Sequence, residues 1–162
     1  MTEIPAPLEL HRETVLPAWT DYNGHMNLAY YLLAFDHATD AFFDYIDLGH
    51  AYRLRSDHSL FSLEAHVSYL RELNEGDPLC FTTQLIAFDA KRIHYFHAMY
   101  HAAERYLAAT NELLSIHVSL DARRASAMPA AALARLERLM AEHARLPTPP
   151  QLGRVIALRR KG

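Results

Sequence analysis

The sequence has few of the features that would place a chain in a specialised class. Cys80 is the single cysteine, so no disulfide can form within the chain, and a lone thiol suits a reducing compartment. No apolar run approaches the roughly 20 residues of a membrane helix, and the N-terminus lacks a basic-then-apolar signal pattern. The formal net charge of −3 provides no basic field to attract nucleic acid. We therefore expect a cytoplasmic protein that binds neither nucleic acid nor membranes.

The composition is that of a globular protein with a sizeable core. The 162 residues are 51% hydrophobic and 22% charged. A chain of this length predicts a single domain over residues 1–162. Eleven histidines are many, so metal sites have to be considered.

The strongest periodic pattern predicts one long helix, from Leu28 to about Leu48. Apolar side chains recur there at spacings of three and four, and at 1.5 Å per residue the helix is roughly 30 Å long. Gly49 is placed to end it. The apolar face consists of Leu28, Tyr31, Leu32, Phe35, Ala38, Phe42 and Ile46. The other side carries an acidic stripe of Asp36, Asp40, Asp44 and Asp47. This stripe is either a solvated surface or, at Asp36 and Asp40, the lining of a site at a subunit boundary.

Strand patterns lie on both sides of this helix. Leu8–Val15 predicts a short first strand, and apolar and polar residues alternate over 61–70, so one face of that strand should meet the helix. Short connections favour antiparallel neighbours, because a parallel return needs a crossover. The later strands are predicted at Leu79–Phe88, Arg92–Ala102 and Tyr106–Leu120, and a C-terminal helix at about 129–144. The sequence thus predicts an α+β fold in which a curled antiparallel five-stranded sheet wraps a central helix. A single sheet covers only half of such a helix, which predicts a partner subunit.

The polar segment Asp21–Asn27 reads D-Y-N-G-H-M-N and ends where the long helix begins. Asn27 is a good N-cap, and Gly24 permits a positive φ and a close approach of the backbone to a ligand. The Asp21 carboxylate would then lie beside free N–H groups at the positive end of the helix dipole, where developing negative charge is stabilised. A polar turn before a helix is also common without any catalytic role.

The flanking residues favour the catalytic interpretation, because they resemble the hotdog-fold acyl-CoA thioesterases of the 4-hydroxybenzoyl-CoA-thioesterase-like branch. The resemblance is carried by Val15–Tyr31, then Phe35-Asp36 and Ala38-Thr39-Asp40, and the element order matches over a core of about 8–120. More narrowly, four segments resemble the betainyl-CoA thioesterases of carnitine catabolism. They are Tyr69–Leu73, Gly76–Pro78, Asp89–Arg92 and Ala108–Glu112.

The resemblance implies hydrolysis of an acyl-CoA, best betainyl-CoA, with coenzyme A present only as part of the substrate and product and with no metal. It also implies a homodimer with a joined sheet, in some members a dimer of dimers, and active sites at the dimer interface. The catalytic carboxylate of the family falls on Asp21, as nucleophile or as general base, and the oxyanion-binding amide near the Asn27–Leu28 backbone. The loop residues Asn23, Gly24 and His25 complete the predicted site.

A betainyl group carries a trimethylammonium, which aromatic faces bind. The candidates are Trp19, Tyr22 and Tyr30, with Tyr31 and Tyr69 as either further members or core residues, and Asp36 or Asp40 as counter-charge. The phosphates of coenzyme A need cations near the mouth of the site. Arg71, Lys91, Arg92, Arg123 and Arg124 lie at predicted strand ends, although surface cations are most often only solvated.

Two alternatives share the fold. The hotdog enoyl-CoA hydratases resemble D-x-N-P-x-H, whereas this loop has glycine for proline and His25 one place early, which disfavours hydration. A non-catalytic CoA-binding module has the same fold but no need of a carboxylate at Asp21.

A metal or cysteine enzyme is the third alternative. On a strand, His97 and His101 share a face about 13 Å apart while His94 points to the other, and one zinc ion needs ligands at about 2 Å. Cys80 lies inside an apolar strand, where a thiol is inert. We therefore expect no metal and no nucleophilic cysteine.

Overall fold

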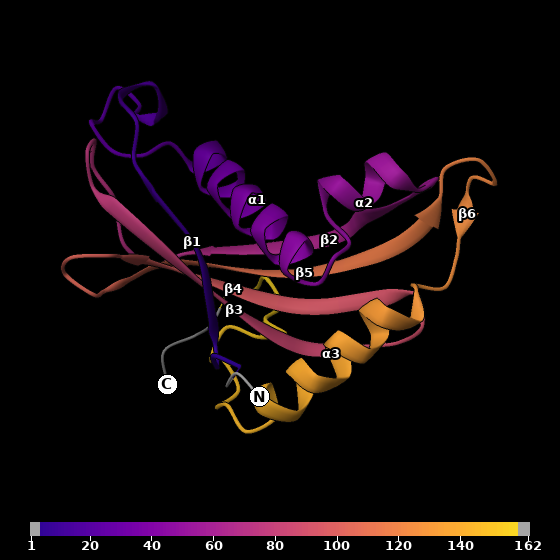
Figure 1. Ribbon diagram of the computed structural model, residues 1–162. Coiled ribbons are helices and arrows are strands. Elements are labelled where there is room, and N and C mark those ends of the chain that lie inside the picture. The colour runs from indigo at the N-terminus through magenta and orange to yellow at the C-terminus, as the bar shows by residue number, and fades with distance from the viewer. Residues whose placement is uncertain (1–3, 159–162) are drawn as a thin grey trace.

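The computed structural model describes residues 4–158 and shows a curled antiparallel sheet with a long helix across its concave face (Figure 1). The strand order is β1-β3-β4-β5-β2, and a short β6 pairs with β5. The elements are β1 (Leu8–Thr14), the 3₁₀ turn η1 (Pro17–Trp19), α1 (Leu28–Tyr45), α2 (His50–Arg55), β2 (His58–Tyr69), β3 (Pro78–Phe88), β4 (Arg92–His101), β5 (Leu107–Ser119), β6 (Arg124–Ala125) and α3 (Ala130–His143). The predicted α+β fold is confirmed. No helix within residues 4–158 is long and apolar enough to cross a membrane.

Helix α1 forms because its apolar residues face the sheet at helical spacing. Phe35, Ala38 and Phe42 are fully buried, and they divide between two core clusters. Phe35 packs with Trp19 and its neighbours at the start of the helix, and Phe42 packs with residues of α3 at the other end. The loop before α1 therefore lies at one end of the sheet and β6 at the other (Figure 1).

The end of α1 differs from the prediction. Asp47, and not Gly49, takes the left-handed conformation, with φ 62°. The Leu48 N–H donates to the Phe43 carbonyl at 2.8 Å and the Asp47 N–H to the Asp44 carbonyl at 3.0 Å, which closes the helix end. Gly49 instead precedes α2, and a Cβ there would collide with Asp44. Helix α2 and strand β6 were not predicted, because six and two residues are too few to show a period.

Strand β2 also differs from the prediction, because it lies at the edge of the sheet. Phe61 and Leu63 are each 52% exposed, so the expectation that their face meets the helix is wrong for these two residues. A bulge between Ser62 and Glu64 shifts the pairing of β2 with β5 at this point. Leu28, which is 65% exposed, adds to the apolar surface at the start of α1.

Candidate active site

A tight loop holds Asp21 just before α1. The Asp21 N–H donates to the His25 carbonyl at 2.9 Å, and the Gly24 N–H donates to the Asp21 carbonyl at 3.0 Å. Gly24 has φ 79°, which a side chain would strain. The carboxylate itself accepts from the Asn23 N–H at 2.8 Å. The loop therefore fixes the orientation of the carboxylate as well as the position of its backbone.

Most backbone N–H groups at the start of α1 are already committed. The Met26 N–H donates to the Leu73 carbonyl at 2.7 Å and the Asn27 N–H to the Trp19 carbonyl at 2.8 Å. The Asn27 side chain accepts from the Ala29 N–H at 3.0 Å, as the N-cap prediction requires. Within residues 4–158, the Leu28 N–H has no such partner. Of the Asn27 and Leu28 amides predicted as the oxyanion donor, only the Leu28 N–H is thus available within residues 4–158.

Asp21 and Leu28 share a cleft of about 400 Å³. One wall comes from the loop and the first turn of α1, and the opposite wall comes from the end of β2. The lining residues are Asp21, Met26, Asn27, Leu28, Tyr31, Tyr69, Leu70, Arg71 and Glu72. The Tyr69 hydroxyl donates to the Leu28 carbonyl at 3.2 Å, which ties the two walls together.

Two tyrosines form the aromatic part of this cleft. The Tyr31 and Tyr69 rings meet edge to face with centroids 5.2 Å apart. Burial raises the pKa of Tyr31 to about 12 and also raises the pKa of Tyr69, so both phenols are neutral at physiological pH. Tyr31 is a core residue, whereas Tyr69 is half exposed. The cleft therefore presents uncharged aromatic surface beside the Asp21 carboxylate.

His25 joins the Asp21 loop to the opposite wall. Its Nε2 lies 3.6 Å from a Glu72 carboxylate oxygen, and its backbone forms an isolated bridge with Asn74. These contacts direct His25 towards the segment after β2.

The three other predicted aromatic residues do not line the cleft. Trp19 is buried and stacks on Tyr30, with ring centroids 5.8 Å apart and planes 14° from parallel. Tyr22 is 97% exposed at the tip of the loop. Of the predicted aromatic residues, Tyr31 and Tyr69 line the cleft, whereas Trp19 and Tyr30 stack on each other.

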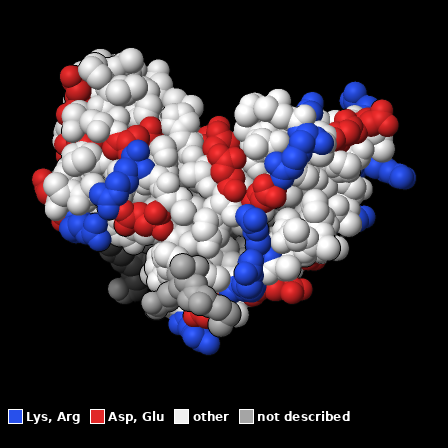
Figure 2. Space-filling view, in the orientation of Figure 1, with Lys and Arg blue, Asp and Glu red and all other residues white. Residues whose placement is uncertain are grey.

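The acidic stripe of α1 forms a second groove of about 400 Å³, on the side of the helix that faces α2 and β2. Asp36, Asp40 and Asp44 line it together with Ser59 and Ser62 of β2. Figure 2 shows a run of acidic side chains along this side of α1. Burial, followed by the charges of Asp36 and Asp44, raises the pKa of Asp40. The stripe is therefore a concave acidic surface, separate from the Asp21 cleft within one chain.

Of the predicted CoA-binding cations, Arg71 is the one at the cleft. Its guanidinium carbon lies 3.7 Å from the centre of the Tyr106 ring. Lys91 lies in the turn between β3 and β4, Arg92 is the first residue of β4, Arg123 precedes β6 and Arg124 lies in it. All four are at the opposite end of the sheet.

The cation of Arg92 is already paired. It contacts the Asp89 carboxylate through Nε at 2.8 Å and Nη2 at 2.6 Å. Hydrogen bonds from the Lys91 N–H and from Arg92 lower the pKa of Asp89 to about 2. Arg92 therefore has less charge to offer a phosphate than its sequence position indicates.

The three histidines of β4 each have separate partners. His97 is buried between the hydroxyls of Thr39 at 3.0 Å and Thr83 at 2.9 Å, and burial lowers its pKa to about 3. His94 lies 2.8 Å from a Glu112 oxygen, and the His101 Nδ1 accepts from the Glu104 N–H at 3.0 Å. These rings do not converge on one point. Cys80 is buried as well, and burial raises the pKa of its thiol.

The sequence did not predict that Leu70 and Glu72 would form one wall of the site. Residues 69–73 supported the family resemblance, but no local pattern shows that they face Asp21. The register of β2 against β5 and the Met26–Leu73 hydrogen bond bring them there. Only pairings between distant segments carry that information.

Comparison with known proteins agrees with this architecture. Residues 15–136 match the family model of the thioesterase-like superfamily. A betainyl-CoA thioesterase of Pseudomonas aeruginosa is 44% identical over 93% of this chain and 95% of its own length. An L-carnitine dehydrogenase/betainyl-CoA thioesterase of Rhizobium meliloti is 36% identical over 95% of this chain, which corresponds to 31% of that longer protein.

Solved structures show the same fold over nearly the whole chain. A Staphylococcus aureus protein solved in complex with CoA has a TM-score of 0.88 and is 28% identical, with 98% of this chain and 100% of that chain covered. A Pseudomonas putida protein described as a putative thioesterase has a TM-score of 0.84 and is 34% identical, with the same coverage. The curled sheet around α1 is thus the predicted hotdog fold. The chain belongs to the thioesterase-like superfamily.

Proposed function

We propose that this protein hydrolyses betainyl-CoA to glycine betaine and free CoA, with Asp21 as the catalytic carboxylate. The observation that carries the proposal is the shared cleft, which Asp21 lines together with Leu28, whose N–H has no partner within residues 4–158. The substrate class is supported by the relative with 44% identity.

The reaction needs a nucleophile and a site for negative charge. In one route Asp21 removes a proton from water, whose oxygen attacks the thioester carbonyl carbon. In the other route an Asp21 oxygen attacks directly, and water then cleaves the resulting anhydride. In both routes the Leu28 N–H donates to the developing oxyanion, the C–S bond breaks, and the CoA thiolate takes up a proton. The positive end of α1 adds to the stabilisation of the oxyanion.

The betainyl group is recognised by its trimethylammonium. The half-exposed Tyr69 ring, backed by the buried Tyr31, and the Glu72 carboxylate provide aromatic surface and negative charge in the same cleft as Asp21. The acidic groove of Asp36 and Asp40 adds further negative charge when a second copy brings it to the cleft. Arg71 is held over the Tyr106 ring and is the cation we assign to the CoA part of the substrate.

A homodimer explains the exposed apolar surface. Leu28 at the start of α1 and Phe61 and Leu63 on β2 are more than half exposed, and β2 presents a 12-residue sheet edge. A second copy that pairs along β2 would join the two sheets and cover these side chains. Sedimentation of the wild type and of Leu63→Lys tests this, since the charge should shift the assembly towards monomers.

The buried lone thiol of Cys80 fits the cytoplasm.

The first experiment measures thiol release from betainyl-CoA by wild type and by Asp21→Asn. The variant keeps the shape of the side chain and removes the base and nucleophile, so kcat should fall at least about 10²-fold. Asp121→Asn is a matched control, because it removes an exposed carboxylate in the turn after β5, outside this cleft. Hydrolysis by Asp21→Asn at the wild-type rate would exclude Asp21 as the catalytic group.

The second experiment isolates the charge of the acyl group. The thioester of 3,3-dimethylbutanoic acid has the shape of the betainyl thioester, with carbon in place of the cationic nitrogen. The enzymatic rate for each ester is divided by the spontaneous hydrolysis rate of that ester, since the ammonium itself activates the carbonyl. We expect kcat/KM to favour the cation at least about tenfold, which corresponds to ~1.4 kcal/mol. A preference for the neutral ester would refute the betainyl assignment, and crotonyl-CoA hydration in the same preparation would indicate the hydratase alternative.

A further inference from the structure

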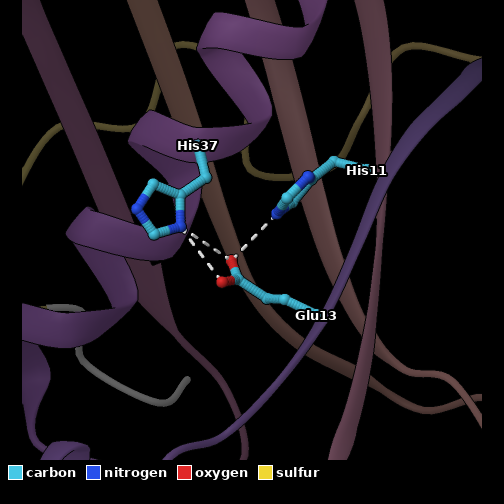
Figure 3. A group of neighbouring side chains, drawn as sticks. All are labelled: His11, Glu13 and His37. Carbon is cyan, nitrogen blue, oxygen red and sulfur yellow. Dashed lines mark hydrogen bonds and ion pairs between the residues drawn. The ribbon is translucent and has the colours of Figure 1, made fainter.

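A second group of polar side chains lies outside the Asp21 cleft, between β1 and α1. His11 and Glu13 point from the same face of β1, and His37 points towards them from the helix (Figure 3). None of the three lines the cleft of Asp21. The proposed hydrolysis does not use them.

The three side chains offer ligand atoms at distances that suit a single ion. His11 Nε2 lies 3.1 Å from one Glu13 oxygen, and His37 Nδ1 lies 3.0 and 3.4 Å from the two oxygens. All the ligand atoms lie within 4.8 Å of one another. Ligands at 2.0–2.1 Å from a tetrahedral zinc are ~3.3 Å apart, so the histidine–glutamate distances already match.

The orientation of the His11 ring also indicates that His11 and Glu13 point at a shared ion and not at each other. Its Nε2 is buried, yet no acceptor lies along its N–H direction within residues 4–158, although the Glu13 oxygen is close. Two ligands of one ion point at the ion and not at each other, so a short distance with poor hydrogen-bond alignment is the geometry that coordination produces. A buried nitrogen without a partner is otherwise unfavourable.

The surroundings favour a bound cation. Arg12, the neighbouring cation on β1, is paired with Glu9 and not with Glu13. The Phe81 ring lies 5.3 Å from His11 and the Trp19 ring 6.4 Å from His37, so each imidazole has an aromatic neighbour. The Glu13 carboxylate is thus half-buried, with two imidazoles as its polar neighbours.

We propose that His11, Glu13 and His37 bind one divalent first-row transition-metal ion, with Zn²⁺ as the best fit and water as fourth ligand. Two imidazoles and a carboxylate suit zinc, whereas calcium and magnesium prefer oxygen ligands. Glu13 and His37 are 24 residues apart, and the Asp21 loop lies between them. The ion therefore closes that loop at its base and ties the edge strand β1 to α1. Its role is structural and separate from the chemistry at Asp21.

The test is a titration of metal-free protein with ZnCl₂, by calorimetry and by thermal unfolding. We expect one equivalent to bind, and at a free zinc concentration of 100 times Kd the Tm should rise by ~5–10 °C. Glu13→Gln and His37→Gln should each weaken binding at least about tenfold. Circular dichroism confirms that both variants fold.

His50→Gln is the matched control, because His50 lies in the acidic groove with Asp40 and is the competing place for a cation. Its zinc affinity should equal that of the wild type, and X-ray absorption of the zinc-loaded wild type should show two imidazole nitrogens. Absence of zinc binding would mean that the cluster is only a hydrogen-bonded bridge, and would overturn the proposal. Equal affinity in wild type and Glu13→Gln, or loss of binding in His50→Gln, would overturn it as well.

Discussion

Replacement of Leu28 by proline removes one backbone N–H and therefore tests whether that group stabilises the oxyanion. Leu28 is the first residue of α1, where proline is favoured and its fixed φ suits the helix. The preceding Asn27 has φ −67° and ψ 144°, which is the extended conformation that a residue before proline needs. Because the Leu28 N–H has no partner within the described chain, its removal breaks no hydrogen bond of the fold.

The expected effect follows from the loss of one donor to the oxyanion. Such a donor is worth ~3 kcal/mol, so kcat should fall about 10²–10³-fold. KM should change little, because the ground-state carbonyl carries less charge than the transition state. The Asn27 cap on the Ala29 N–H is unaffected, so the helix should still form.

Leu28→Ala is the matched reference, since it removes the same largely exposed side chain and keeps the N–H. The assay compares kcat of the two variants on one acyl-CoA by thiol release, with the Tm of each as the check on folding. If folded Leu28→Pro turns over within about threefold of Leu28→Ala, the Leu28 amide does not stabilise the transition state, and the reasoning is refuted.

Two further predictions concern stability. His97 has its pKa lowered to about 3 by burial, so the unfolded chain binds a proton from about pH 6.5 downwards while the folded chain does not. The free energy of unfolding should therefore fall by up to ~1.4 kcal/mol per pH unit below pH 6.5. Urea titrations at several pH values should show a flatter pH dependence of this free energy in His97→Gln than in the wild type. Equal pH dependence in the two proteins would contradict this assignment. Gly49→Ala would place a Cβ 2.8 Å from the Asp44 backbone nitrogen and against its carboxylate, so urea unfolding should show a loss of ~1–3 kcal/mol, and unchanged stability would contradict the collision.

The local patterns of the chain determined much of the fold. The period of apolar residues in α1, the alternation in the strands and the Asn27 cap depend on neighbours within a few residues, so they can be recognised without the tertiary structure. The D-Y-N-G-H-M-N segment indicated where a carboxylate would stand at a helix start, and the structure shows Asp21 in a cleft there. The end of α1 was harder, because Asp47 took the left-handed conformation expected at a glycine.

By itself, the sequence determined the α+β class, the central helix and the loop that carries Asp21, because these follow from short-range periodicity and capping. Only the tertiary structure decided which groups meet that loop. The Met26–Leu73 hydrogen bond between distant segments brings Glu72 to the cleft, and packing stacks Trp19 on Tyr30. The Leu28 N–H has no partner within residues 4–158. The tertiary structure also placed His37 beside His11 and Glu13, a contact between a helix and a strand that no local spacing encodes. Such contacts depend on register and packing, which are properties of the whole chain.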